Sequence, residues 1–152
     1  MLIILDHQLR EHIPHNAIEF PITYYHDELV ALPDRTGPLH WHPDFEIATA
    51  EFGVLDYQVG EHHIVLEAGD SIFVNGNMLH GIKQLSGDVP DPMPNIVFSG
   101  TLIAPKTSAI YQKHILPIVW YAPYMVDNGN IQKLSYEEHI LCLKRNIVKN
   151  SS

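Results

Sequence analysis

The stretch GPLHWHPDFE, residues 37–46, packs two histidines, two acids, a tryptophan and a phenylalanine into ten residues. Alternate residues of a strand face the same side, so we expect His40 and His42 to point to one face and Trp41 to the other. Two imidazoles and the carboxylate of Glu46 suit a divalent transition metal. Asp44 follows a proline at the strand entry, and we expect it to be solvated.

A fourth ligand must come from elsewhere in the chain. His80 is the natural candidate, because it follows the NGN turn (75–77) and begins a further β-rich run, HGIKQL. The sequence therefore predicts a site with two parts that lie far apart in the chain. The alternative is that these residues form a polar lining that binds no metal and instead forms hydrogen bonds to a ligand.

Length and composition restrict the class of protein. The chain has 152 residues, the size of one domain, with 45% hydrophobic residues and a formal net charge of −9. An acidic surface repels phosphate, so we expect no nucleic-acid binding by this segment itself. A single cysteine, Cys142, and the short apolar run at residues 2–5 predict a protein of the cytoplasm without a signal peptide or membrane span.

Short β-rich runs separated by turn residues fill the middle of the sequence and predict an all-β barrel or sandwich over residues 18–103. The segment 31–38 is expected to be a loop, as is the proline-rich 86–94. Two helices are expected afterwards, at 106–116, closed by Pro117, and at 135–150. The predicted strands are 18–26, 45–52, 54–59, 62–66, 71–74, 80–85 and 95–103.

The spacing of the candidate ligands resembles the two motifs of the cupin superfamily. The first motif reads H-x-H-x3-E-x6-G from His40 to Gly53, and the second runs from Gly69 through Asn75 and Asn77 to His80. The resemblance implies an antiparallel β-barrel, the double-stranded β-helix, in which the three histidines and Glu46 are the ligand positions. The chain departs from the pattern where Asn75 and Asn77 replace a proline and a glycine, and where Gln84 replaces an asparagine.

The chain resembles the N-terminal effector-sensing domain of AraC-family transcriptional regulators in three segments: PLHWHPDFEI, SIFVNGNMLHGI and SAIYQKHILPIV. This resemblance implies a sensor barrel at 1–104 and a helical extension at 105–152 that takes part in dimerisation. It also implies a DNA-binding helix-turn-helix half that this sequence lacks. We therefore expect a homodimeric, non-enzymatic sensor that binds a small effector, a sugar or another polar metabolite. It would bind DNA only through the missing half.

The resulting hypothesis assigns His40, His42, Glu46 and His80 to a metal, with Zn²⁺, Ni²⁺, Fe²⁺ and Mn²⁺ all open, or to direct contact with the effector. Phe73 and Met78 are added as ligand contacts. The alternative hypothesis is a small metal-dependent cupin enzyme, a dioxygenase or an isomerase.

Overall fold

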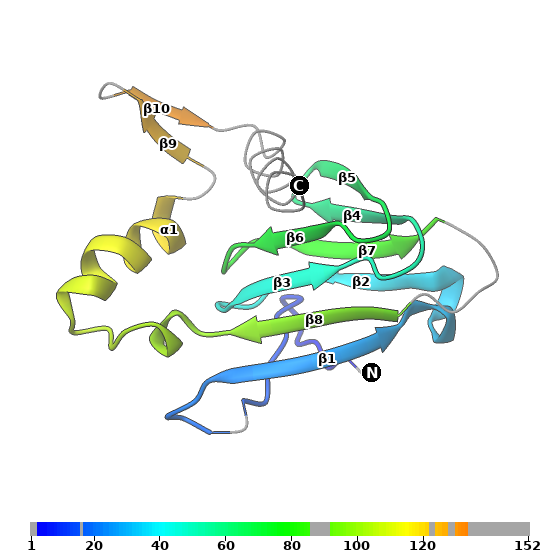
Figure 1. Ribbon diagram of the computed structural model, residues 1–152, viewed down its shortest axis with the longest axis horizontal. Coiled ribbons are helices and arrows are strands. Elements are labelled where there is room, and N and C mark those ends of the chain that lie inside the picture. The colour runs from blue at the N-terminus through cyan, green and yellow to red at the C-terminus, as the bar shows by residue number, and fades with distance from the viewer. Residues whose placement is uncertain (1–2, 16, 86–91, 122–123, 128–129, 134–152) are drawn as a thin grey trace, which may run out of the picture.

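The computed structural model describes residues 3–15, 17–85, 92–121, 124–127 and 130–133, and shows two antiparallel four-stranded sheets facing each other (Figure 1). The first sheet has the order β1 (Ile22–Glu28), β8 (Pro92–Phe98), β3 (Phe45–Thr49), β6 (Ser71–Val74). The second has the order β2 (Thr36–His40), β7 (His80–Gln84), β4 (Leu55–Val59), β5 (His62–Leu66). The mainly-β fold expected from the sequence is confirmed.

The closed barrel is not observed, since no ladder joins one sheet to the other in the part of the chain that the structure describes. The edge strand β6 has four residues, and the register of β2 shifts between Gly37 and His40. These short or irregular edges end the ladders before they meet the opposite sheet. The inward side chains of both sheets nevertheless form one core: Ala48, Leu55, Tyr57, Val59, Ile64, Leu66, Ile72, Val74, Ile82 and Met93.

Turn chemistry sets the register of the strands nearest the site. β4 and β5 form a hairpin with a two-residue turn, in which Gly60 has a φ of 57°, as its position between two β-rich runs predicts. Asn77 takes a φ of 64° in the turn before β7, where asparagine tolerates the left-handed region. β7 therefore starts at His80, directly opposite His40 of β2.

Prolines affect the predicted boundaries in two ways. β1 starts immediately after Pro21 and lies at the edge of its sheet, as a proline in this run predicts. β8, however, begins at Pro92, inside the segment expected to be a loop. This is possible because β3 pairs with β8 only from Asn95 to Phe98, so the proline half of β8 has a partner on one side only. The expected loop 31–38 likewise contains the start of β2, after short 3-10 turns η1 (Leu29–Ala31) and η2 (Pro33–Arg35).

The helix expected to end at Pro117 instead continues through this residue. After the 3-10 turn η3 (Gly100–Leu102), the chain forms a π-helical segment, η4 (Tyr111–Ile115), followed directly by α1 (Leu116–Tyr121). Leu116 N–H donates to the Tyr111 carbonyl, five residues back. The wider turn displaces the carbonyls against which a proline ring would clash in a regular α-helix, so Pro117 is accommodated.

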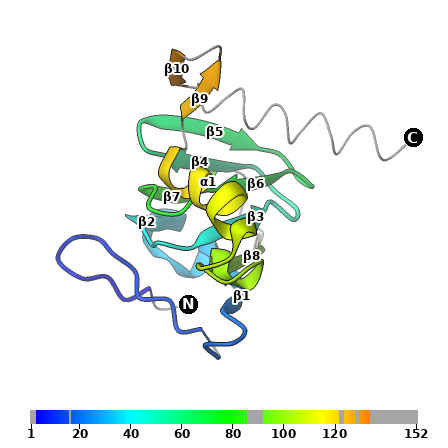
Figure 2. The same cartoon turned by 90° about the vertical axis from the view of Figure 1, so that its left-hand side faces the viewer.

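The helical segment packs at one end of the strands, as the end-on view in Figure 2 shows. Tyr111 and Ile115 join Phe45 and Ala104 in a second apolar cluster outside the main core. The Asn75 side chain donates to the carbonyl of Ile118 over 2.7 Å and so ties α1 to the turn before β7. The chain continues into a hairpin of β9 (Tyr124–Asp127) and β10 (Asn130–Lys133). The second expected helix, 135–150, lies outside the described residues, and the division at residue 104 stays a prediction.

Within the described ranges, no helix has the length and apolar character needed to cross a membrane.

Gly76 is a position where backbone atoms leave no room for a side chain. A Cβ atom there would lie 2.3 Å from the carbonyl oxygen of Pro43, a backbone atom that cannot rotate away. We expect Gly76→Ala to lower the free energy of unfolding by about 1–3 kcal/mol, measured by chemical denaturation. Asn77→Gly, in the same turn, should stay within about 1 kcal/mol of the wild type, because it removes a left-handed non-glycine residue. Equal stability of the two variants would contradict the close approach.

Candidate metal centre

His40, His42, Glu46 and His80 converge at the end of the strands nearest α1. His40 is the last residue of β2 and His80 the first of β7, and the two are cross-strand partners. Glu46 comes from β3 of the opposite sheet, and His42 from the connection between β2 and β3. One nitrogen or oxygen atom from each of the four lies within 4.8 Å of the corresponding atom of every other. The group predicted from sequence is therefore brought together, and it can hold a metal ion.

Backbone carbonyls fix the orientation of all three imidazoles. Nδ1 of His40 lies 2.9 Å from the Pro38 carbonyl oxygen, Nδ1 of His42 lies 3.0 Å from that of Asp44, and Nδ1 of His80 lies 2.7 Å from that of Met78. Because a carbonyl oxygen only accepts, each Nδ1 carries the hydrogen, and Nε2 is the atom that each ring turns toward the cluster. Such outer contacts are the usual means of orienting histidine ligands.

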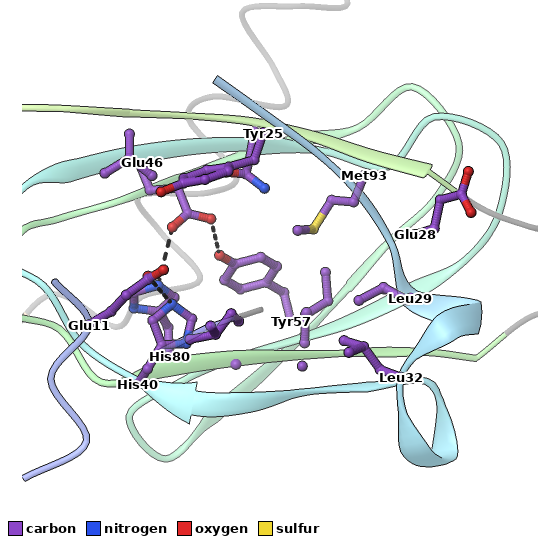
Figure 3. Close-up of a pocket in the computed structure, with 16 residues that line it drawn as sticks. Glu11, Tyr25, Glu28, Leu29, Leu32, His40, Glu46, Tyr57, His80 and Met93 are labelled. Carbon is purple, nitrogen blue, oxygen red and sulfur yellow. Dashed lines mark hydrogen bonds and ion pairs between the residues drawn. The ribbon is translucent and has the colours of Figure 1, made fainter. Parts of the chain in front are cut away.

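The carboxylate of Glu46 is the centre of the group. Its Oε2 lies 3.1 Å from Nε2 of His42 and 3.3 Å from Nε2 of His80. Tyr57 donates its hydroxyl to Oε1 over 2.8 Å (Figure 3). Burial by itself raises the pKa of Glu46, but its contacts with Nε2 of His42 and of His80, which donate when these imidazoles are protonated, outweigh burial and hold this pKa well below its usual range. Glu46 is therefore an anion with almost no exposure to water.

The environments of two histidines shift their pKa values in opposite directions. Burial, with a contribution from the neighbouring His80, lowers the pKa of His40 to about 4. Burial also opposes charge on His42, yet its hydrogen bond to Glu46 and the charge of that carboxylate raise its pKa overall. At neutral pH, His40 is thus an uncharged imidazole, which is the form that binds a metal.

His42 reaches the cluster from outside the strand, since β2 ends at His40. The Asn77 N–H donates to the His42 carbonyl over 2.7 Å, so the turn before β7 holds this residue in place. Trp41 points away from the cluster, as expected: its indole N–H donates to the Gln8 carbonyl, and the Arg10 guanidinium lies over its ring. Asp44 is not solvated, because its Oδ2 lies 3.1 Å from Nε2 of His15 and its side chain is 14% exposed.

The two further ligand contacts expected from sequence are not among the residues that line the cavity beside the histidines. Phe73 faces the outside of its sheet and packs on Phe45, 5.4 Å between ring centroids, in the cluster under the helix. Met78 packs against the main core and supplies only its carbonyl, to His80. The alternation of side chains along β6 explains the placement of Phe73, since Ile72 and Val74 take the inward positions.

The structure adds two residues that sequence reasoning missed. Tyr57 could have been found from the alternation of β4, where it shares the inward face with Leu55 and Val59. Glu11 had no local signal. The Oε2 atom of Glu11 lies 3.4 Å from Nε2 of His40. The two residues meet because the N-terminal segment pairs with Trp41, far along the chain.

A cavity between the sheets opens onto this cluster. His40, Glu46 and His80 line one end, Tyr57 and Met93 the middle, and Glu28 with the leucines 29 and 32 the other end (Figure 3). Its volume of about 40 Å³ admits a few atoms beside the donors. A larger ligand would enter only if the walls moved.

Comparison with known proteins identifies the region that carries the site. Residues 28–90 match the family model of the cupin domain, and this segment includes all four metal-binding candidates. Across 136 residues the chain is 25% identical to an uncharacterised HTH-type transcriptional regulator, YdeC, of Bacillus subtilis (strain 168). That match covers 85% of this chain and 44% of the regulator, so the chain spans less than half the length of this relative.

The solved structures that match the chain have lower sequence identity. An RmlC-like cupin from Shewanella frigidimarina NCIMB 400 is 20% identical, with a TM-score of 0.43, over 53% of this chain and 68% of that one. A predicted oxalate decarboxylase from Thermotoga maritima is 19% identical, with a TM-score of 0.42, over 51% of this chain and 64% of that one.

Tyr57→Phe tests the support of the buried carboxylate. The variant keeps the ring and removes one donor from Glu46, so we expect the free energy of unfolding to fall by about 1–3 kcal/mol, measured by denaturation in the presence of a chelator. Tyr24→Phe, at a tyrosine that is 61% exposed, is the matched control and should change stability by less than about 0.5 kcal/mol. Equal effects of the two variants would argue against the hydrogen bond to Glu46.

Proposed function

We propose that this chain is the effector-sensing part of an AraC-family transcriptional regulator and that its cupin domain holds a divalent transition metal. The observation that carries the regulatory role is the match to an HTH-type transcriptional regulator along 85% of this chain. In this proposal the chain acts within a longer protein whose helix-turn-helix units bind DNA. Homodimerisation belongs to the same proposal and follows from the resemblance alone.

The distances between the donor atoms support a bound metal ion. Ligand atoms on one ion, each at about 2.1 Å from it, lie roughly 3.0–3.4 Å apart in octahedral and tetrahedral arrangements. The separations of Glu46 Oε2 from Nε2 of His42 and of His80, 3.1 and 3.3 Å, are of this size. Three nitrogen donors and one carboxylate are also the ligand types that Zn²⁺, Ni²⁺, Fe²⁺ and Mn²⁺ share. The identity of the metal is not part of the proposal.

The cavity supports a small effector. His40, Glu46 and His80 face it, so a polar group of the effector would meet the ion, or the donor atoms themselves, at the closed end of the cavity. The effector class that we propose from the family resemblance is a sugar or another polar metabolite, with its polar end toward the cluster, and its entry would require the cavity walls to move apart. Entry of such a ligand would favour one arrangement of the two sheets relative to α1, which packs at the same end of the strands, and this shift would reach the DNA-binding half.

The metal is tested by the double variant His40→Ala with His80→Ala. Because both residues supply Nε2 donors, we expect elemental analysis of the purified protein to find near-stoichiometric metal in the wild type and almost none in the variant. The control is His62→Ala with His63→Ala, which removes two exposed histidines of β5 and should leave the metal content unchanged. Retention of metal in a folded His40→Ala, His80→Ala variant would refute the ligand assignment.

The regulatory role is tested on the protein that the complete gene encodes. We expect that protein to bind the DNA upstream of its own gene, with an affinity that changes when the metal-binding histidines are substituted. Absence of any helix-turn-helix region in the gene product, or DNA binding that is the same in wild type and double variant, would contradict the sensing role.

A small metal-dependent enzyme is the second candidate. It is favoured by the side of the cluster that faces the cavity, where a bound ion would be within reach of a small substrate as a Lewis acid. Turnover of a substrate by the Fe²⁺-loaded protein, lost in the same double variant, would favour this candidate over the sensor.

A further inference from the structure

Glu11 lies outside the matched cupin domain, at residues 28–90, and yet contacts one of its candidate ligands. Its side chain is buried and lines the same cavity as His40, Glu46 and His80 (Figure 3). Glu11 Oε2 lies 3.4 Å from Nε2 of His40. The question is what a buried carboxylate does beside the nitrogen that His40 offers to a metal.

The N-terminal segment is fixed in place by backbone hydrogen bonds. Trp41 N–H donates to the Leu9 carbonyl over 3.0 Å, and Glu11 N–H donates to the Trp41 carbonyl over 2.9 Å. Asp6 closes the preceding turn by accepting from the N–H groups of Gln8 and Arg10. These contacts extend the edge of β2 by a short parallel bridge and hold Glu11 beside His40. The position of the carboxylate is therefore built into the fold.

The Glu11 carboxylate lies on the side of His40 that faces the cluster. Nδ1 of His40 lies 2.9 Å from the Pro38 carbonyl oxygen, so Nε2 is the ring nitrogen that faces both the cluster and Glu11. A divalent ion bound by this nitrogen would lie close to the Glu11 carboxylate and would be attracted by its negative charge.

We propose that Glu11 is a fifth protein group of the metal site, a second carboxylate that balances the charge of the bound divalent ion on the His40 side. This proposal rests on the metal-binding part of the proposed function. With Glu46 as the first carboxylate, two negative side chains offset the two positive charges of the ion in a site that is shielded from water. Glu11 lies outside the group of four whose donor atoms are all within 4.8 Å of one another, so its place is at the periphery of the ion.

The test is a titration of the metal-free protein with Co²⁺, followed by visible absorption, on the wild type and three variants. Glu11→Gln keeps the shape of the side chain and removes its charge, so we expect binding to weaken about 10- to 100-fold, as for other outer partners of metal sites. Glu28→Gln removes a charge from the far, exposed end of the same cavity and is the matched control. Its affinity should stay within about threefold of the wild type, because solvent screens its charge.

Glu11→Asp separates charge from structure. It retains the carboxylate on a shorter side chain, so we expect it to bind Co²⁺ more tightly than Glu11→Gln does, while circular dichroism and unfolding without metal show that both variants fold. Equal affinity of Glu11→Gln and Glu28→Gln would overturn the proposal, as would a loss in Glu11→Asp as large as in Glu11→Gln. Failure of the wild type to bind Co²⁺ would instead refute the metal site itself.

Discussion

The buried carboxylate of Glu46 is the constraint on which the arrangement of the two sheets depends. A carboxylate that is 5% exposed is tolerated only if its oxygens are paired. The partners come from three places: Tyr57 on β4, His80 at the start of β7 and His42 on the connection after β2. Tyr57 and His80 belong to the sheet opposite Glu46, and His42 follows the strand β2 of that same sheet. The offset between the sheets is therefore set by a polar contact as well as by the apolar core.

The same contact explains why the turns around the site are tightly specified. His42 precedes the bend at Pro43 and Asp44, and His80 follows the turn at Gly76 and Asn77. The bend and the turn are held together by the hydrogen bond from Asn77 N–H to the His42 carbonyl and by the close approach of Gly76 to Pro43. The carbonyls of Asp44 and Met78 within these turns orient the imidazoles. Backbone geometry thus selects which ring nitrogen faces Glu46, and metal binding through Nε2 would require that selection.

Much of the fold could be predicted because its signals are local. The hairpin of β4 and β5, the strand β6 and the start of β7 follow from alternation and turn residues, and the motif spacing pointed to the four candidate ligands. Two expectations from the sequence do not hold in the structure, for reasons of local geometry. Pro117 ends no helix, since the preceding π-helical turn accommodates it, and Phe73 faces the helix because the strand parity places Ile72 and Val74 inside. Closure of the barrel depends on edge pairing, which the sequence does not encode locally.

The sequence by itself determined which residues are the candidate donors, because residue type and the spacing of the two motifs single out three histidines and one glutamate. It also determined that Trp41 faces away from His40 and His42. Only the tertiary structure decided that Tyr57 supports Glu46 and that Glu11 lies beside His40. The reason is physical: a hydrogen bond across two sheets, or from the N-terminal segment to Trp41, joins residues whose separation in the chain carries no periodic signal. Such contacts form only when the whole fold brings the segments together.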